Sequence, residues 1–165
     1  QKPIQKITFS ADVLTDFNWN FNVKTSSFDL SVNPLSILFP QYWYGSSNKL
    51  EDIYSSLVIT DLGQREAENA LRQLPKGAKI LSKVYSLGWE LTEGRKVTPA
   101  HLFFANFYLD IDYKSTDVPQ DKAVDIFFYN DSLGKWEPTN ATKNSYYTRL
   151  SKNLIKPEKF VVVAY

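Results

Sequence analysis

The chain has 165 residues, of which 43% are hydrophobic and 22% are charged, and its 19 lysines and arginines nearly cancel its 18 aspartates and glutamates. This composition excludes an intrinsically disordered segment, because such segments lack the residues that build a core. The balanced charge argues against a nucleic-acid-binding or anionic-membrane surface. With no cysteine and a single histidine, the chain cannot form a disulfide framework, a thiolate nucleophile or a multi-histidine metal centre. We expect a single domain over residues 1–165, and a start at Gln1 rather than methionine indicates a fragment of a larger protein.

Hydrophobic and polar residues alternate with a period of two early in the chain. Apolar residues occupy every second position over residues 17–23, with asparagines at positions 18, 20 and 22 between them. The same alternation returns over residues 28–32, after Thr25 and Ser26. Because successive side chains of a strand point to opposite faces, these two segments predict a hairpin with one buried face and one polar face.

A helical period then interrupts the strands. Apolar residues recur with the spacing of one helix face at Ala67, Ala70, Leu71 and Leu74. Asp61 is placed to cap the start of this helix, and Pro75 to end it. We therefore predict one short helix over about residues 63–74, between strands at 53–60 and 79–91, where it closes an edge or an end of a sheet.

Strand signals resume in the second half. Residues 103–111 and 124–128 alternate again, and the turn at 131–134 predicts a hairpin with residues 135–137. Residues 159–165 are almost continuously apolar, which is typical of a strand covered on both faces. Roughly nine or ten short strands with one helix predict an all-β fold, namely a two-sheet antiparallel β-sandwich. No apolar run reaches the roughly 20 residues that cross a bilayer, so we expect no membrane insertion.

Three consecutive aromatics beside a turn form the first candidate site. Tyr42, Trp43 and Tyr44 precede a glycine and serines, and period two cannot bury all three rings. Exposed rings of this kind could stack on sugars, with Asn48 hydrogen-bonding to hydroxyls. The alternative is a hydrophobic plug that closes one end of the sandwich, since large aromatics usually bury their ring bodies.

A group of aspartates forms the second candidate. Asp110, Asp112, Asp117 and Asp121, followed by Asp125, are close enough in sequence to suggest a Ca²⁺ site. The spacing lacks the D-x-D-x-D-G loop, and the first two fall on the outward face of a strand, so solvated charges are the preferred interpretation. We predict no metal and no cofactor. His101 has no Ser, Thr or Cys beside it, which favours a structural or surface role.

The order of several segments in the second half is similar to that of a known β-sandwich family. The pattern consists of residues 74–78 and 83–87, then the strand 123–130 followed by Gly134, Lys135 and Trp136, and finally the closing run 159–163. It resembles the bacterial extracellular relatives of the zona-occludens/uncoordinated-type β-sandwich found in ankyrins and netrin receptors. The resemblance implies a non-enzymatic interaction or spacer module within a larger surface protein. Some relatives cleave themselves at a His-Phe-Ser or His-Leu-Ser/Thr step, but residues 158–161 read Glu-Lys-Phe-Val, so we expect no self-cleavage.

These observations lead to a functional expectation with two alternatives. We expect a non-catalytic structural or adhesive module of a secreted or cell-surface bacterial protein, with a protein or polysaccharide partner. The first alternative is a carbohydrate-binding module that uses Tyr42, Trp43 and Tyr44. A hydrolase with Asp110 and Asp112 as its acids is the least favoured alternative, because no nucleophile elbow or phosphate loop accompanies them.

Overall fold

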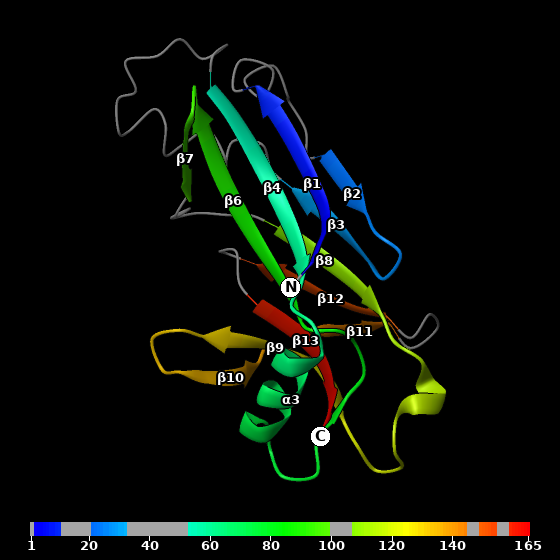
Figure 1. The fold of residues 1–165 in the computed structure, drawn as a ribbon. Coiled ribbons are helices and arrows are strands. Elements are labelled where there is room, and N and C mark those ends of the chain that lie inside the picture. Colours follow the sequence, from blue (N-terminus) through cyan, green and yellow to red (C-terminus); the bar gives the residue numbers. More distant parts are fainter. Residues whose placement is uncertain (1, 11–20, 33–52, 100–106, 145–148, 155–158) are drawn as a thin grey trace.

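The computed structural model describes residues 2–10, 21–32, 53–99, 107–144, 149–154 and 159–165. These residues form two antiparallel β-sheets and one α-helix (Figure 1). The predicted all-β, two-sheet sandwich is thereby confirmed. Within the described part of the chain, no helix has the length and apolar character needed to cross a membrane.

The larger sheet has eight strands, in the order β1-β4-β6-β13-β9-β10, with β5 beside β13 and β7 beside β6. Its strands are β1 (Lys2–Ser10), β4 (Ile53–Asp61), β5 (Lys79–Ile80), β6 (Tyr85–Glu93), β7 (Lys96–Pro99), β9 (Val124–Asn130), β10 (Lys135–Pro138) and β13 (Lys159–Ala164). Among the described residues, two pairs join β6 to β13, Ser86 with Lys159 and Tyr85 with Phe160. The sheet therefore consists of two halves that meet at the start of β6, as Figure 1 shows.

The smaller sheet has five strands, in the order β11-β12-β8-β3-β2. Its strands are β2 (Phe21–Lys24), β3 (Phe28–Val32), β8 (Phe107–Asp112), β11 (Thr142–Asn144) and β12 (Arg149–Leu154). Strand β3 alternates buried and half-buried residues along its whole length, as its sequence predicts. The described part of the predicted first hairpin is confirmed, because β2 pairs with β3 around the turn at Thr25 and Ser26.

The main core lies between the two sheets. Its fully buried members include Leu30 and Leu109 from the five-stranded sheet and Ile59 and Val162 from the eight-stranded sheet. Phe28 lies near the middle of this core, with its ring centroid 4.9 Å from that of Tyr85 and 5.5 Å from that of Phe160. Edge-to-face contacts of this kind add to the stabilisation that comes from burying the rings.

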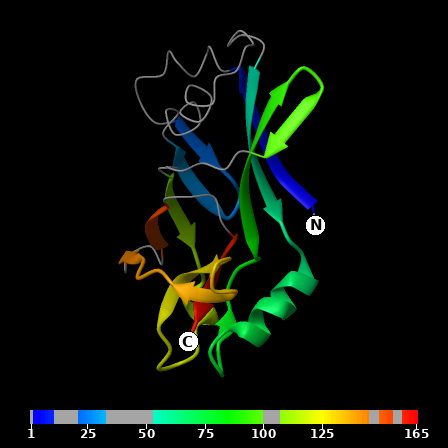
Figure 2. The same ribbon diagram turned by 90° about the vertical axis from the view of Figure 1, so that its left-hand side faces the viewer.

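A second core lies on the opposite face of the eight-stranded sheet, beneath helix α3 (Gln64–Gln73). Ala70 and Leu74 of this helical segment pack with Phe127, Val161 and Val163. Successive residues of β13 thus face the two cores in turn, so the predicted strand covered on both faces is confirmed. In Figure 2 the five-stranded sheet, the eight-stranded sheet and α3 follow one another as layers.

Three local predictions about the helical segment and its flanks are wrong. The helix covers a face of the sheet rather than an edge or an end, because its apolar stripe meets the outward apolar residues of β9 and β13. Asp61 does not cap the helix: its Oδ1 accepts from the backbone N–H of Gly63 at 2.9 Å, and Gly63 is the N-cap with φ 87°. The strand expected at 79–91 is divided into β5 and β6. In the interruption, Ser82 Oγ accepts from the backbone N–H of Val162 at 2.9 Å and replaces a ladder bond.

Candidate functional site

The outer face of the five-stranded sheet gathers polar side chains into rows, because the strand register aligns them across the sheet. The first row comprises Asn22, Ser31, Tyr108 and Asn153. The second row comprises Lys24, Asp29, Asp110, Ser151 and Thr142. The third row comprises Asp112, Arg149 and Asn144. We call these residues the polar face; each is exposed or half-buried.

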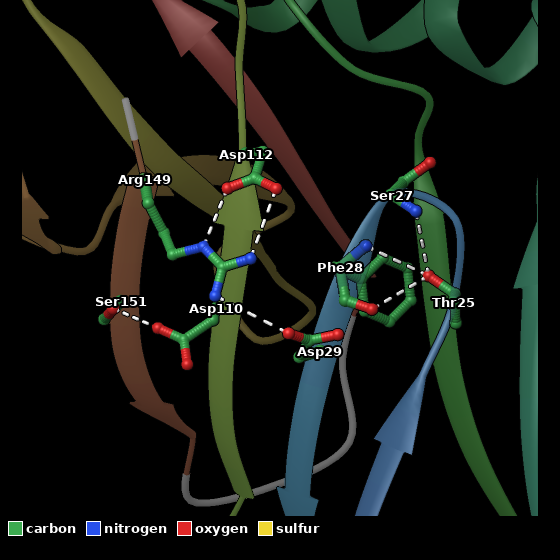
Figure 3. Close-up of polar contacts among 8 residues, drawn as sticks. All are labelled: Thr25, Ser27, Phe28, Asp29, Asp110, Asp112, Arg149 and Ser151. Carbon is green, nitrogen blue, oxygen red and sulfur yellow. Dashed lines mark hydrogen bonds and ion pairs between the residues drawn. The ribbon is translucent and has the colours of Figure 1, made fainter. Parts of the chain in front are cut away.

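Arg149 connects three strands of the polar face. Its Nε and Nη2 donate to the two carboxylate oxygens of Asp112 at 2.7 and 3.2 Å, and its Nη1 lies 3.5 Å from Oδ2 of Asp29 (Figure 3). The hydrogen bond to Asp112 is the main reason that the pKa of the Arg149 guanidinium is raised above its ordinary range. Asp110, beside this cluster, accepts a hydrogen bond from the hydroxyl of Ser151. The guanidinium is thus permanently charged and held in one orientation.

Tyr108 is the aromatic residue of the polar face. It lies in β8, the central strand of the five, and is 42% exposed. Its cross-strand neighbours are Ser31 on β3 and Asn153 on β12. A large ring with short polar side chains on either side in its row presents apolar surface to solvent beside hydrogen-bonding groups.

A cleft of about 930 Å³ adjoins the polar face at Asp112. Helix α3 and residues 78–85 line one side of it, and the β2–β3 turn and the end of β8 line the other. The turn is held by Thr25, whose Oγ1 accepts from the backbone N–H groups of Ser27 and Phe28 at 3.2 and 3.0 Å (Figure 3). The cleft therefore has a fixed rim where it meets the sheet.

Charged groups line the cleft with no marked excess of either sign. Lys83 forms an ion pair with Asp61 at 3.2 Å, and Lys79 Nζ donates to the backbone carbonyl of Asp117 at 2.8 Å. The backbone N–H of Gly63 is the main cause that lowers the pKa of Asp61 below its usual value of 3.8, and Lys83 adds to this effect. The cations and carboxylates that line the cleft therefore largely balance.

A smaller hollow of about 260 Å³ lies between α3 and the β9–β10 hairpin, and its lining residues contact one another. Lys159 Nζ lies 4.8 Å from the centroid of the Tyr129 ring and 3.3 Å from Oε1 of Glu66. Tyr129 in turn meets the ring of Trp136 edge to face, with centroids 5.4 Å apart. These contacts fasten the helix to the sheet, and we assign them a structural role.

The predicted site residues are distributed over different parts of the chain. Tyr42, Trp43, Tyr44, Asn48 and His101 lie outside the described residues. Asp110 and Asp112 belong to the polar face, whereas Asp117 ends the 3₁₀ helix η2 (Ser115–Asp117) and Asp121 adopts a left-handed conformation with φ 66°. Among the described residues, no group of three or more histidine, aspartate or glutamate side chains is arranged to hold a metal ion.

One carboxylate, that of Asp125, was underrated in the sequence-based prediction of the site. It is 4% exposed. Its Oδ1 accepts from the backbone N–H groups of Ile126 and Ala141 at 2.7 and 2.9 Å, and its Oδ2 accepts from that of Asn140 at 2.9 Å. Asp125 therefore fixes the turn that follows β10. The signal that could have found it is an aspartate inside a strand that is apolar on both sides.

No known family model and no curated protein matches this sequence. The geometry of the polar face and of the cleft therefore carries the functional argument.

Proposed function

We propose that the chain is a non-catalytic structural or adhesive module of a secreted or cell-surface bacterial protein, which binds a protein or polysaccharide partner through the polar face. The observation that carries the proposal is the cluster in which Asp112 and Asp29 hold Arg149 across three strands. Ion pairs as exposed as these contribute only about 0.2–1 kcal/mol to stability. Their larger effect is to present a fixed pattern of charge and hydrogen-bonding groups to a partner.

A binding role accounts for the carboxylates better than catalysis does. Both oxygens of Asp112 accept hydrogen bonds from Arg149, and Asp110 accepts one from Ser151. A glycoside hydrolase needs one carboxyl free to donate a proton and a second free to act as nucleophile or base. The interactions of Asp110 and Asp112 are those of a positioned surface, which supports the non-catalytic proposal over the hydrolase alternative.

The cell-surface location is proposed because the second half of the chain resembles bacterial extracellular sandwich modules. The absence of cysteine is compatible with this location, since the chain needs no disulfide to reach its fold. The two cores bury apolar side chains on both faces of β13. A domain of this size can be stable through such burial without disulfides or metal ions.

The test compares two arginine variants on one array of bacterial and host surface proteins and polysaccharides. Arg149→Gln removes both ion pairs of the polar face, and Arg72→Gln is the matched control because Arg72 is exposed on α3 and bonds to Asn69 there. We expect at least one probe to retain the wild type and the control but to lose most of its affinity for Arg149→Gln. Equal retention of all three chains, no retention on any probe, or chemical conversion of the bound probe would each refute the proposal.

A further inference from the structure

We propose that the polar face binds an uncharged glycan chain, with Tyr108 as the stacking platform and the neighbouring amides, carboxylates and Arg149 as hydrogen-bonding groups. The inference rests on the proposed function, since it names the ligand class for the same surface. It also moves the expected sugar contact from residues 42–44 to a sheet face.

The exposure of Tyr108 is the first step. The residue is 42% exposed in the central strand of the sheet, although the buried face of the same strand offers places for apolar side chains such as Leu109 and Ile111. The electron-rich face of an aromatic ring attracts positively polarised C–H groups. A pyranose presents such C–H groups on one side of its ring and hydroxyl groups around its edge, so it matches Tyr108 and its surroundings at once.

The surroundings supply the hydrogen bonds. A hydroxyl group both donates and accepts, so a sugar site needs donors and acceptors interleaved. Asn153 and Asn22, in the same row as Tyr108, offer amides with both functions, and Asp110 in the next row offers a carboxylate. Neighbouring strands lie about 4.8 Å apart and successive outward residues of one strand about 6.7 Å apart. The face is therefore a grid of polar groups around one ring, wide enough for a chain of sugars.

The charge of the face selects between classes of glycan. Three carboxylates, those of Asp29, Asp110 and Asp112, accompany the two cations Lys24 and Arg149. The guanidinium is already engaged by two of these carboxylates. An anionic polysaccharide would meet a face on which carboxylates outnumber cations and the positive charge of Arg149 is already paired, so we infer an uncharged ligand.

The cluster around Arg149 also prepares the face for binding. A flexible side chain loses conformational freedom when a ligand orders it, and this loss weakens binding. Arg149 and its carboxylate partners are held before any ligand arrives, and the strand register fixes the backbone positions from which the other side chains of the face project. A glycan can then dock on a cluster around Arg149 that needs little reordering.

The experiment measures depletion of the full 165-residue chain by insoluble or immobilised polysaccharides. Uncharged probes are cellulose, xylan, mannan, chitin and a mixed-linkage β-glucan; charged probes are heparin and polygalacturonate. Tyr108→Ala removes the platform, Tyr108→Phe keeps the ring, and Tyr54→Ala is the matched control because Tyr54 is 44% exposed on β4 of the other sheet. Asn153→Ala tests the face without altering an aromatic residue.

We expect retention on at least one uncharged probe, weakened about tenfold or more by Tyr108→Ala, less by Asn153→Ala, and unchanged by Tyr54→Ala or Tyr108→Phe. Retention only on the charged probes, equal retention of Tyr108→Ala, or loss by Trp43→Ala alone would overturn the inference. If the array instead yields a protein ligand that depends on Arg149 while no polysaccharide is retained, the proposed function stands and only the glycan inference fails. Should Tyr108→Ala prove unfolded by its thermal melt, Asn153→Ala decides.

Discussion

Replacing Asp125 with alanine should destabilise the fold more than any other single change to a carboxylate discussed above. The carboxylate is 4% exposed and accepts from three backbone N–H groups. Thr139 Oγ1 donates a fourth hydrogen bond to Oδ1 of Asp125 at 3.3 Å. Alanine keeps the chain direction but leaves these donors without their common acceptor.

The size of the effect follows from which donors water can reach. Hydrogen bonds to a charged group contribute about 1.5–3 kcal/mol each when their donors are buried. Ile126 is fully buried, whereas Asn140 is exposed and Ala141 is half-buried. Water can therefore replace the lost hydrogen bonds to the N–H groups of Asn140 and Ala141 but not the one to Ile126. We therefore expect Asp125→Ala to lower the free energy of unfolding by about 2–4 kcal/mol. Asp125→Asn, which keeps one acceptor oxygen, should cost about half as much.

The measurement is equilibrium unfolding in urea followed by tryptophan fluorescence. Asp131→Ala, in the exposed β9–β10 turn, is the matched control and should change stability by less than about 0.5 kcal/mol. In a thermal melt the alanine variant should lose about 4–16 °C. A loss below about 1 kcal/mol for Asp125→Ala, or equal losses for Asp125→Ala and Asp131→Ala, would refute the reasoning that this carboxylate fixes the turn.

Three further predictions follow from the same structure. The folded-state pKa of Asp61 is lowered, so its ionised form stabilises the fold above about pH 4 and this contribution is lost as the pH falls through the lowered value; Asp61→Asn should therefore be less stable than wild type at about pH 6, the difference should shrink as the pH falls below about 4, and a constant difference would contradict this. Leu74→Ala should cost about 2–4 kcal/mol because Leu74, the C-cap residue of α3, is 7% exposed and packs in the second core, whereas Leu71→Ala, at 46% exposed, should cost less than about 0.5 kcal/mol; equal costs would mean that the helix does not cover the sheet. Addition of calcium or of a chelator should move the melting midpoint by less than about 1 °C. A larger shift would show that the aspartates between Asp110 and Asp125 bind calcium.

The sequence predicted best those features that a single strand determines alone. The alternation over Phe28–Val32 specified which face of β3 is buried, and the continuous apolar run after Lys159 specified a strand buried on both faces. Both outcomes depend on the period of two and on nothing distant in the chain. The hairpin of β9 and β10 was likewise predictable, because a short turn sets its register locally.

The position of the helix required information that no local pattern contains. The apolar stripe of α3 showed that one side would be buried, but it could not show against which surface. Phe127, Val161 and Val163 were visible as apolar residues on the second face of their strands. Burial of these residues needs a further layer over that face of the sheet. Only a combination of the strand pattern with the single predicted helix could have indicated that α3 forms this layer.

The polar face could not be assembled from the sequence because its rows depend on pairings between distant segments. Asp112 and Arg149 are 37 positions apart, and they meet only through the register of β8 with β12. A shift of one residue in that register would turn Arg149 toward the core. Asp110 and Asp112 were correctly placed on an outward strand face, but their partners Ser151 and Arg149 were not foreseen.

The composition of the polar face also discriminates between the two kinds of partner. A stable protein interface buries about 800 Å² on each side and desolvates an apolar centre surrounded by a polar rim. Here the arrangement is different, since Asp110 lies near the centre, the Arg149–Asp112 pair lies in the adjacent row, and Tyr108 is the single large ring of the face. A protein that covered this surface would have to strip water from charged groups, and the lost solvation can exceed the gain from new contacts. A glycan keeps much of that water and replaces some of it with hydroxyls, so the same centre costs less to cover. This balance of desolvation is the physical reason for expecting a polysaccharide, rather than a protein, on the outer face of the five-stranded sheet.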